Sequence, residues 1–185
     1  MARARKRLSP TGRGPVTTAR SGDALTTELV DPRSAEGRAV VRRFYADIVG
    51  RYWGRPATDA EIERAMLDEP SDDLRGDSGF LLVVQDGVHV VGCGGVRLIE
   101  PGVGELTRIF IDKTVRGRGA GRTLIGELES MSASRGVRTL RLTVRGDLVE
   151  AHRLYQRLGY ETVEPFSSSP YADFHLAKKL PPTAD

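Results

Sequence analysis

Arg116-Gly117-Arg118-Gly119-Ala120-Gly121-Arg122 is a glycine-rich segment that follows a β-rich run and precedes an apolar pattern of helical period. A glycine-rich turn between a strand and a helix exposes backbone N–H groups at the positive end of the helix dipole, which suits a phosphate or pyrophosphate. The segment is not a Walker A loop, because Arg116 occupies the position of the first glycine and Arg122 replaces the lysine. It is not the dinucleotide fingerprint either, because its glycines follow G-x-G-x-G spacing and lie late in the chain. The segment therefore predicts an anion-binding loop that belongs to neither of these two nucleotide-binding classes.

The residues after the loop predict a crossover between two parallel strands. Apolar residues repeat at helical intervals up to Gly136, and a β-rich run follows over 138–144. A β-loop-α-β unit of this kind needs a right-handed crossover and a locally parallel pair of strands. A further helix is predicted over 148–158, and closing strands are predicted over 160–163 and 173–180.

Two helices are predicted in the N-terminal part of the chain. Apolar residues at helical spacing indicate a helix over 34–49, with Ser34 or Asp31 as its cap. Residues 50–56 interrupt this pattern. A second helix is expected over 58–67, where the first threonine and the glutamate three positions later have the signature of a capping box.

An antiparallel meander is predicted between these helices and the loop. β-rich runs cover 80–84, 88–98 and 105–112. The first two are joined by Asp86-Gly87, a two-residue hairpin signal, and residues 100–102 form another turn. Three consecutive strands with short connections therefore lead to the glycine-rich loop.

Two motifs set in this order of elements resemble those of the GCN5-related N-acetyltransferases (GNATs). Arg116, Gly119 and Gly121 match the R-x-x-G-x-G form of the family's acetyl-CoA loop. The later run is similar to the family signature A-x-x-L-Y-x-x-x-G-[FY], and its matching residues are Ala151, Leu154, Tyr155, Gly159 and Tyr160. The resemblance covers about residues 23–180.

The resemblance implies a GNAT fold of the α/β (α+β) class. Such a fold has a mixed central sheet of about six or seven strands, with an antiparallel N-terminal meander, one splayed parallel pair and about four helices. A length of 185 residues fits a single domain. We expect a flexible basic tail over 1–22 and one acetyltransferase domain over 23–185.

The resemblance also implies which residues bind the cosubstrate acetyl-CoA. Backbone groups of Ile109, Phe110 and Ile111 would pair with the pantetheine arm as an added strand does. The loop amides from Gly117 through Gly119, Ala120 and Gly121 to Arg122 would bind the pyrophosphate. The side chains of Arg116, Arg118 and Arg122 would add positive charge, and at least one of the three is expected to face water.

Tyr155 matches the family tyrosine whose hydroxyl points at the CoA sulfur, and the resemblance implies that it protonates the departing thiolate. The alternative interpretation is an aromatic core residue on an amphipathic helix. The asparagine that the family often has three residues before Ala151 is Leu148 here, so one polar contact with CoA is absent. His152, on the same helix, is interpreted as a surface or packing residue rather than a base.

Glu105 is the candidate base that removes a proton from the attacking amine, since an ammonium has no lone pair. It opens the strand before the loop, where several family members carry a catalytic glutamate or bind a water that relays the proton. The alternative is an exposed carboxylate at the strand end, or one paired with Arg108 or Arg141. Asp147, Glu150 or water alone could also serve as the base.

The net charge of +3 divides unevenly along the chain. Residues 1–20 carry six basic residues and no acidic residue, so residues 21–185 carry a net charge of −3. A basic tail suggests weak contact with nucleic acid, but such segments are commonly just solvated. We therefore do not expect nucleic acid as a partner.

The sequence favours a cytoplasmic protein without membrane partners. Its apolar runs stay below the roughly 18 residues needed to span a bilayer, and the basic start has no apolar region behind it of the kind that a secretory signal needs. Cys93 is the single cysteine, which excludes an internal disulfide and a cysteine-based zinc site. His89 and His175 lack partners at metal-ligand spacing, so no metal is expected.

The acceptor side is predicted from charge and aromatic residues. Residues 58–86 hold nine acidic and two basic residues, whereas residues 105–185 carry a net charge of +3. An acidic surface would attract a cationic amine; the alternative is an ordinary solvated helix and loop. Tyr45, Tyr52 and Trp53 are candidates for lining an acceptor pocket, or for the core.

The resulting functional prediction is an enzyme that transfers an acetyl group from acetyl-CoA directly to a primary amine, most simply that of a small molecule. The alternatives are acetylation of a protein N-terminus or lysine, and a sensor that binds CoA without turnover. The family often dimerises, so a homodimer is kept as an option.

Overall fold

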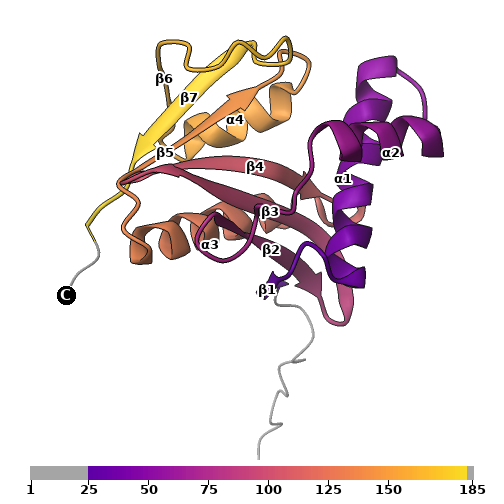
Figure 1. Ribbon diagram of the computed structural model, residues 1–185, viewed down its shortest axis with the longest axis horizontal. Coiled ribbons are helices and arrows are strands. Elements are labelled where there is room, and N and C mark those ends of the chain that lie inside the picture. The colour runs from indigo at the N-terminus through magenta and orange to yellow at the C-terminus, as the bar shows by residue number, and fades with distance from the viewer. Residues whose placement is uncertain (1–24, 183–185) are drawn as a thin grey trace, which may run out of the picture.

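The computed structural model describes residues 25–182, so the basic tail expected over 1–22 lies outside the described residues. Within 25–182 the chain forms four α-helices, one 3₁₀ turn and a seven-stranded mixed sheet with strand order β1-β2-β3-β4-β5-β7-β6 (Figure 1). The expected fold class, with six or seven strands and four helices, is confirmed. In chain order the elements are β1 (Leu25–Val30), α1 (Ala35–Trp53), α2 (Asp59–Asp68), β2 (Gly79–Asp86), β3 (His89–Glu100), β4 (Val103–Ile111), the 3₁₀ turn η1 (Lys113–Val115), α3 (Ala120–Ser134), β5 (Thr139–Val144), α4 (Val149–Arg157), β6 (Glu161–Thr162) and β7 (Phe174–Lys179).

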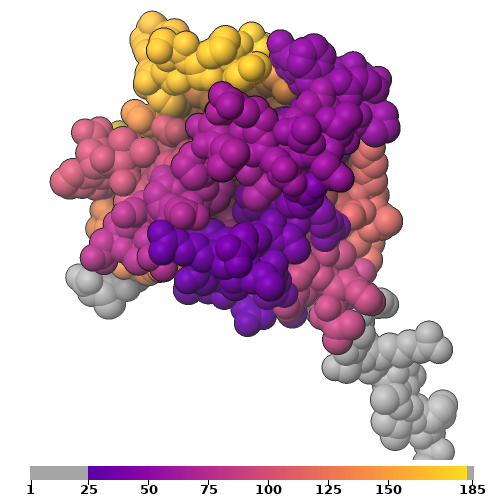
Figure 2. Space-filling view, turned by 45° about the vertical axis from the view of Figure 1, so that its right-hand side comes forward, coloured from indigo at the N-terminus to yellow at the C-terminus, as the bar shows by residue number. Residues whose placement is uncertain are grey.

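The sheet separates two apolar clusters, because side chains along a strand alternate between its faces. The larger cluster joins α3 and α4 to one face, with Leu124, Leu140 and Tyr155 among its buried members. The smaller cluster joins α1 and α2 to the other face, with Val40 and Ile62 among its members. We call these the α3/α4 face and the α1/α2 face. Figure 2 shows the N-terminal residues, in indigo to magenta, spread over one side of the molecule with the yellow C-terminal strand region beside them.

The parallel strands β4 and β5 are paired at one end only. Their register covers Val103↔Thr139, Gly104↔Leu140 and Glu105↔Arg141. Beyond this point β4 continues to Ile111 and β5 to Val144 without pairing with each other, so the two strands separate. The splayed parallel pair that the sequence predicts is present.

The helix caps follow the sequence, but the end of the first helix does not. The Ser34 side chain accepts a hydrogen bond from the Gly37 amide at 3.0 Å, and the expected capping box is present at the start of α2. The predicted interruption over 50–56 is wrong at its start, because α1 continues to Trp53. Gly54 ends it, with φ +65° and an amide that bonds back to the last turn.

The meander has four strands rather than the predicted three. β1 pairs antiparallel with β2 along all six of its residues, from Leu25↔Asp86 to Val30↔Leu81. The predicted hairpin between β2 and β3 is present, with Asp86 opposite His89 and Gly87 in the left-handed region at φ +61°. The meander therefore extends the sheet by one edge strand before the chain enters α1.

Candidate active site

The N-terminus of α3 is left without a side-chain cap in the described part of the chain. Its N-cap is Gly119, at φ +87°, whereas Ser34 and Thr58 cap α1 and α2 with their hydroxyls. The first N–H groups of an α-helix have no intrahelical acceptor, and the helix dipole makes this end positive. The predicted loop therefore presents backbone donors that no side chain occupies.

Close packing brings the two sequence motifs together. A Cβ atom on Gly121 would lie 3.0 Å from Cδ2 of Leu154 on α4, so glycine allows the start of α3 to approach α4. Ala120 is buried in the larger cluster, which also contains Tyr155. The glycine-rich loop and the helix that carries the tyrosine thus form one side of the opening between β4 and β5.

Two of the three loop arginines bind the protein itself. Arg116 donates through Nε to the Ile111 carbonyl at 3.0 Å and lies 3.6 Å from Asp47 on α1. Arg118 makes a bidentate pair with Asp86 at 2.6 and 3.4 Å, and this hydrogen bonding lowers the pKa of Asp86. Arg122 is exposed and makes no ion pair with any residue in 25–182. Arg116 and Arg118 therefore hold the loop in place, and Arg122 is the arginine that faces water.

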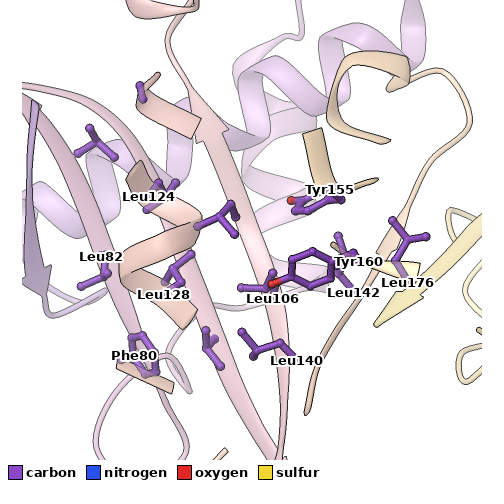
Figure 3. Close-up of a cluster of buried hydrophobic side chains, with 14 of the residues drawn as sticks. Phe80, Leu82, Leu106, Leu124, Leu128, Leu140, Leu142, Tyr155, Tyr160 and Leu176 are labelled. Atoms are coloured by element: carbon purple, nitrogen blue, oxygen red, sulfur yellow. The ribbon is translucent and has the colours of Figure 1, made fainter. Parts of the chain in front are cut away.

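Tyr155 is buried, with 3% of its surface exposed. Its ring meets the edge of the Tyr160 ring at a centroid distance of 5.5 Å, and both rings lie beside β4 together with Leu106 (Figure 3). Burial raises the pKa of Tyr155 above its ordinary value of about 10. The residue is thus part of the apolar core and also a hydroxyl that keeps its proton.

A β-bulge interrupts β4 next to this opening, opposite the glycines of β3 (Gly92, Gly94 and Gly95), whose pattern suggests a bulge or a close approach to the backbone. The register of β3 against β4 shifts between Cys93↔Phe110 and Gly95↔Thr107, which inserts one extra residue into β4. Arg108 lies in this bulge at φ +57°, the only non-glycine residue of 25–182 with positive φ. The bulge reverses the alternation of the strand: Leu106 belongs to the larger cluster and Phe110 to the smaller one, while Ile109 and Ile111 pack against the larger one.

The Arg108 side chain is buried against the α1/α2 face, with 4% of it exposed. Its guanidinium donates to the Glu69 carbonyl at 2.7 Å and to the Ser71 hydroxyl at 3.0 Å. It also lies over the ring of Tyr45 at 5.1 Å, whose own hydroxyl donates to the Glu69 carbonyl. Burial raises the pKa of Tyr45 to about 12. Arg108 therefore fastens the segment after α2 onto the bulge of β4.

Glu105 pairs with Arg141 rather than with Arg108. The distance from Arg141 Nε to Glu105 Oε2 is 3.1 Å, and these two residues are the last pair of the parallel ladder. Since Leu106 faces α3 and α4, the alternation of β4 places Glu105 on the α1/α2 face. The other candidate bases are engaged as well, because Asp147 binds Arg145 and Glu150 binds Arg51 at 2.5 Å.

The acidic stretch over 58–86 does not present the uncompensated negative charge that the sequence predicts. Eight of its nine acidic residues lie in ion pairs with arginines, most of which come from other parts of the chain. Asp73, for example, binds Arg97 of β3 at 2.5 Å. The excess negative charge of the stretch over 58–86 is therefore largely compensated in the folded chain.

The three candidate aromatic residues separate into core and surface. Tyr45 is 4% exposed and belongs to the smaller cluster, whereas Tyr52 and Trp53 are 52% and 56% exposed. Tyr52 also meets Tyr171, in the loop before β7, at a centroid distance of 5.7 Å. His152 stacks on Phe174 at 4.5 Å, in line with its predicted packing role.

Within residues 25–182, no three His, Cys, Asp or Glu side chains gather closely enough to hold a metal ion. None of the helices described there is long and apolar enough to cross a membrane. Cys93 is buried, and burial raises the pKa of its thiol to about 12, so it is a neutral core residue.

Residues 41–160 match the acetyltransferase (GNAT) family. The chain belongs to this family. The match spans the α1/α2 face, the glycine-rich loop and the tyrosine helix, so the resemblance drawn from the two short motifs is confirmed over most of the domain.

Two curated relatives with higher identity match about half of the chain. An IAA acetyltransferase from Azospirillum brasilense is 33% identical over 91 residues, which are 49% of this chain and 59% of the relative. A mycothiol acetyltransferase from Kytococcus sedentarius is 42% identical over 88 residues, which are 45% of this chain and 29% of the relative. The matches thus span less than two thirds of the length of either relative. A GNAT acetyltransferase from Elizabethkingia anophelis, solved with acetyl-CoA bound, shares the fold with a TM-score of 0.60 and 14% identity, over 85% of this chain and 99% of the other.

Proposed function

We propose that this chain is an N-acetyltransferase that moves an acetyl group from acetyl-CoA directly to a primary amine of a small molecule. The observation that carries the proposal is the start of α3. It has N–H groups without a side-chain cap, and it packs against the helix of the buried Tyr155. A helix end that suits a pyrophosphate, beside a buried hydroxyl, is what acyl transfer from a CoA thioester requires.

The loop residues fit the anionic part of acetyl-CoA. Gly117 and Gly119 have φ of +81° and +87°, a conformation that favours glycine, and a Cβ on either would meet no protein atom within 4 Å. The loop surface is thus open to a ligand, and the exposed Arg122 adds positive charge beside it. From Ile109 to Ile111, β4 pairs with β3 on one side only and borders the gap to β5 on the other, where its backbone would pair with the pantetheine arm.

Acetyl-CoA would supply an activated acyl group as a thioester. The chain would supply the groups that accept and donate protons, one on each face of the sheet. On the α1/α2 face, Glu105 would accept a proton from the acceptor ammonium. On the α3/α4 face, the protonated Tyr155 would donate a proton to the thiolate, and the second proton that the attacking nitrogen loses as the amide forms would restore the Tyr155 hydroxyl. A neutral, buried Cys93 is a poor nucleophile, which supports direct transfer. A single cysteine is also consistent with a cytoplasmic setting.

A small acceptor is supported by the contacts that bridge the end of α1 to the C-terminal part. Tyr52 meets Tyr171, and Arg51 binds Glu150 of α4. These contacts hold the end of α1 against the C-terminal part of the chain, and Figure 2 shows N-terminal residues directly beside the yellow C-terminal region. The two relatives are named for different molecules, IAA and mycothiol, so the acceptor is left to experiment.

The proposal is tested by measuring thiol release from acetyl-CoA with a panel of amines, and by mass spectrometry of the products. We expect acetylated small amines with turnover well above hydrolysis without an amine. Modification confined to peptide N-termini or lysines would replace the small acceptor by a protein. Tight CoA binding without turnover on any amine would make the chain a sensor.

Two glycine variants serve as a matched pair in this assay. Gly117 and Gly102 both have φ +81°, and a Cβ atom added to either would lie in open space. Gly117→Ala and Gly102→Ala therefore carry the same backbone strain of about 1–2 kcal/mol. Only Gly117→Ala should weaken acetyl-CoA binding, by about 10-fold, since its methyl group would stand in the open space of the ligand and displace one charge-assisted hydrogen bond. Equal affinities for both variants would remove the loop from the binding site.

Glu105→Gln tests the base. Glutamine can still accept a hydrogen bond from Arg141 but cannot take a proton, so kcat/KM should fall by about 10²-fold. Glu100→Gln, at an exposed residue that ends β3, is the control and should leave kcat/KM unchanged. A loss below about threefold in Glu105→Gln would assign proton removal to water.

A further inference from the structure

A row of charged side chains crosses three strands on the α1/α2 face at the point where β4 and β5 separate. Glu105 lies at its centre, with Arg97 opposite it on β3 and Arg141 opposite it on β5. Arg97 is occupied, since its Nε binds Asp73 at 2.5 Å and its Nη2 donates to the Pro70 carbonyl at 3.1 Å. Arg141 differs, because only its Nε is engaged, by Glu105.

The guanidinium of Arg141 is held in place by an aromatic stack. Its Cζ lies 4.3 Å from the centroid of the Phe166 ring. The Phe166 amide in turn donates to Nδ1 of the buried His175 at 3.3 Å. The Arg141 side chain is 23% exposed, and its Nη1 and Nη2 atoms make no hydrogen bond with residues of 25–182. The outer edge of the guanidinium is thus fixed in orientation, accessible and unused.

An arginine in this state is suited to a carboxylate, because its two parallel N–H donors match the two oxygens and the stack limits the entropy lost on binding. The neighbouring Glu105 suits the ammonium group. Opposite charges 3.1 Å apart in the protein match a ligand whose amine and carboxylate are separated by one or a few carbon atoms.

We infer that Arg141 binds the carboxylate of the acceptor, so that the acceptor is an amine that also carries a carboxylate, of the amino-acid class. This inference rests on the proposed function and names the substrate class of the same site. The sequence predicts that the acidic residues over 58–86 attract the cationic amine, but ion pairs largely neutralise them. Recognition of the acceptor by Arg141 and Glu105 replaces that expectation.

The test compares three acceptors that share one side chain: a free amino acid, its carboxamide and the decarboxylated amine. Wild-type kcat/KM should favour the amino acid by about 10- to 100-fold, the value of one charge-assisted pair. Arg141→Gln should abolish this preference through a higher KM for the amino acid, whose kcat/KM should fall about 10- to 100-fold further than that for the carboxamide, since only the carboxamide reports the loss of the Glu105 pair alone. Arg141→Lys should restore part of the preference. Arg138→Gln, at an exposed arginine before β5, is the matched control.

Two outcomes would overturn the inference and leave acetyl transfer intact. One is equal kcat/KM for the amino acid and its carboxamide, and the other is an equal loss on both in Arg141→Gln, which would assign Arg141 a structural role. Acetylation of peptides in preference to all free amino acids would also contradict the inference, because Arg141 would then not bind the carboxylate of a free amino acid. If no acceptor turns over, calorimetric titration of amino acids decides separately: binding lost in Arg141→Gln upholds the inference, and no binding to the wild type rejects it.

Discussion

Tyr155→Phe should lower kcat by about 10²- to 10³-fold, while the affinity for acetyl-CoA stays within about threefold of the wild type. The substitution removes one hydroxyl from a ring that is 3% exposed and keeps the apolar contacts of that ring. Because burial raises the pKa of Tyr155, the hydroxyl holds its proton at every pH below its ordinary value of about 10. The loss in kcat should therefore be constant across neutral pH.

Tyr160→Phe provides the control for this prediction. Tyr160 is also buried and its ring touches that of Tyr155, while its hydroxyl interacts with Glu129. Removing that hydroxyl should leave kcat unchanged. Measured kcat at saturating acetyl-CoA, with binding by calorimetry, separates the two variants. Unchanged turnover in Tyr155→Phe would remove the proton donor from the mechanism.

Features of the fold that depend on a few adjacent residues could be predicted from the sequence. The capping box of α2 and the turn at Gly87 form through contacts within four residues, so their signals are local. The end of α1 was misplaced because a glycine ends a helix only where its backbone becomes left-handed. Gly54 does this and Gly50 does not. Strand β1 was missed because six residues at a sheet edge, largely exposed, carry little apolar pattern.

The features of the candidate site also divide into those that a short motif predicts and those that depend on residues far apart in the sequence. The loop and Tyr155 could be found because each lies within a short motif, and Gly121 brings them together in space. The pairings of Arg116 with Asp47 and of Arg118 with Asp86 join residues more than thirty positions apart, so no local pattern reveals them, and the pair of Glu105 with Arg141 is only one of the alternatives that the sequence leaves open. The glycines of β3 mark the place of the bulge, but Arg108 itself carries no such signal in β4, since arginine is not a residue that favours positive φ.

Arg108→Ala should lower the free energy of unfolding by about 2–4 kcal/mol. The variant removes the donors to the Glu69 carbonyl and the Ser71 hydroxyl, and the stacking on Tyr45. It also leaves a Cβ atom in the left-handed region. Arg64→Ala is the control, because that arginine is 77% exposed in its pair with Asp68 and should cost about 0.5 kcal/mol or less.

Arg108→Gly separates the anchor from the backbone strain. At φ +57°, glycine avoids about 1–2 kcal/mol of steric cost but loses about 0.5–1 kcal/mol through its freer unfolded chain. Arg108→Gly should therefore be about 0.5–1 kcal/mol more stable than Arg108→Ala, and both should be less stable than the wild type in urea unfolding. If alanine proves the more stable of the two, the bulge is not strained. If Arg108→Ala is as mild as Arg64→Ala, the buried guanidinium does not fasten the segment after α2 to β4, and the strained backbone must be held by its pairing with β3 alone.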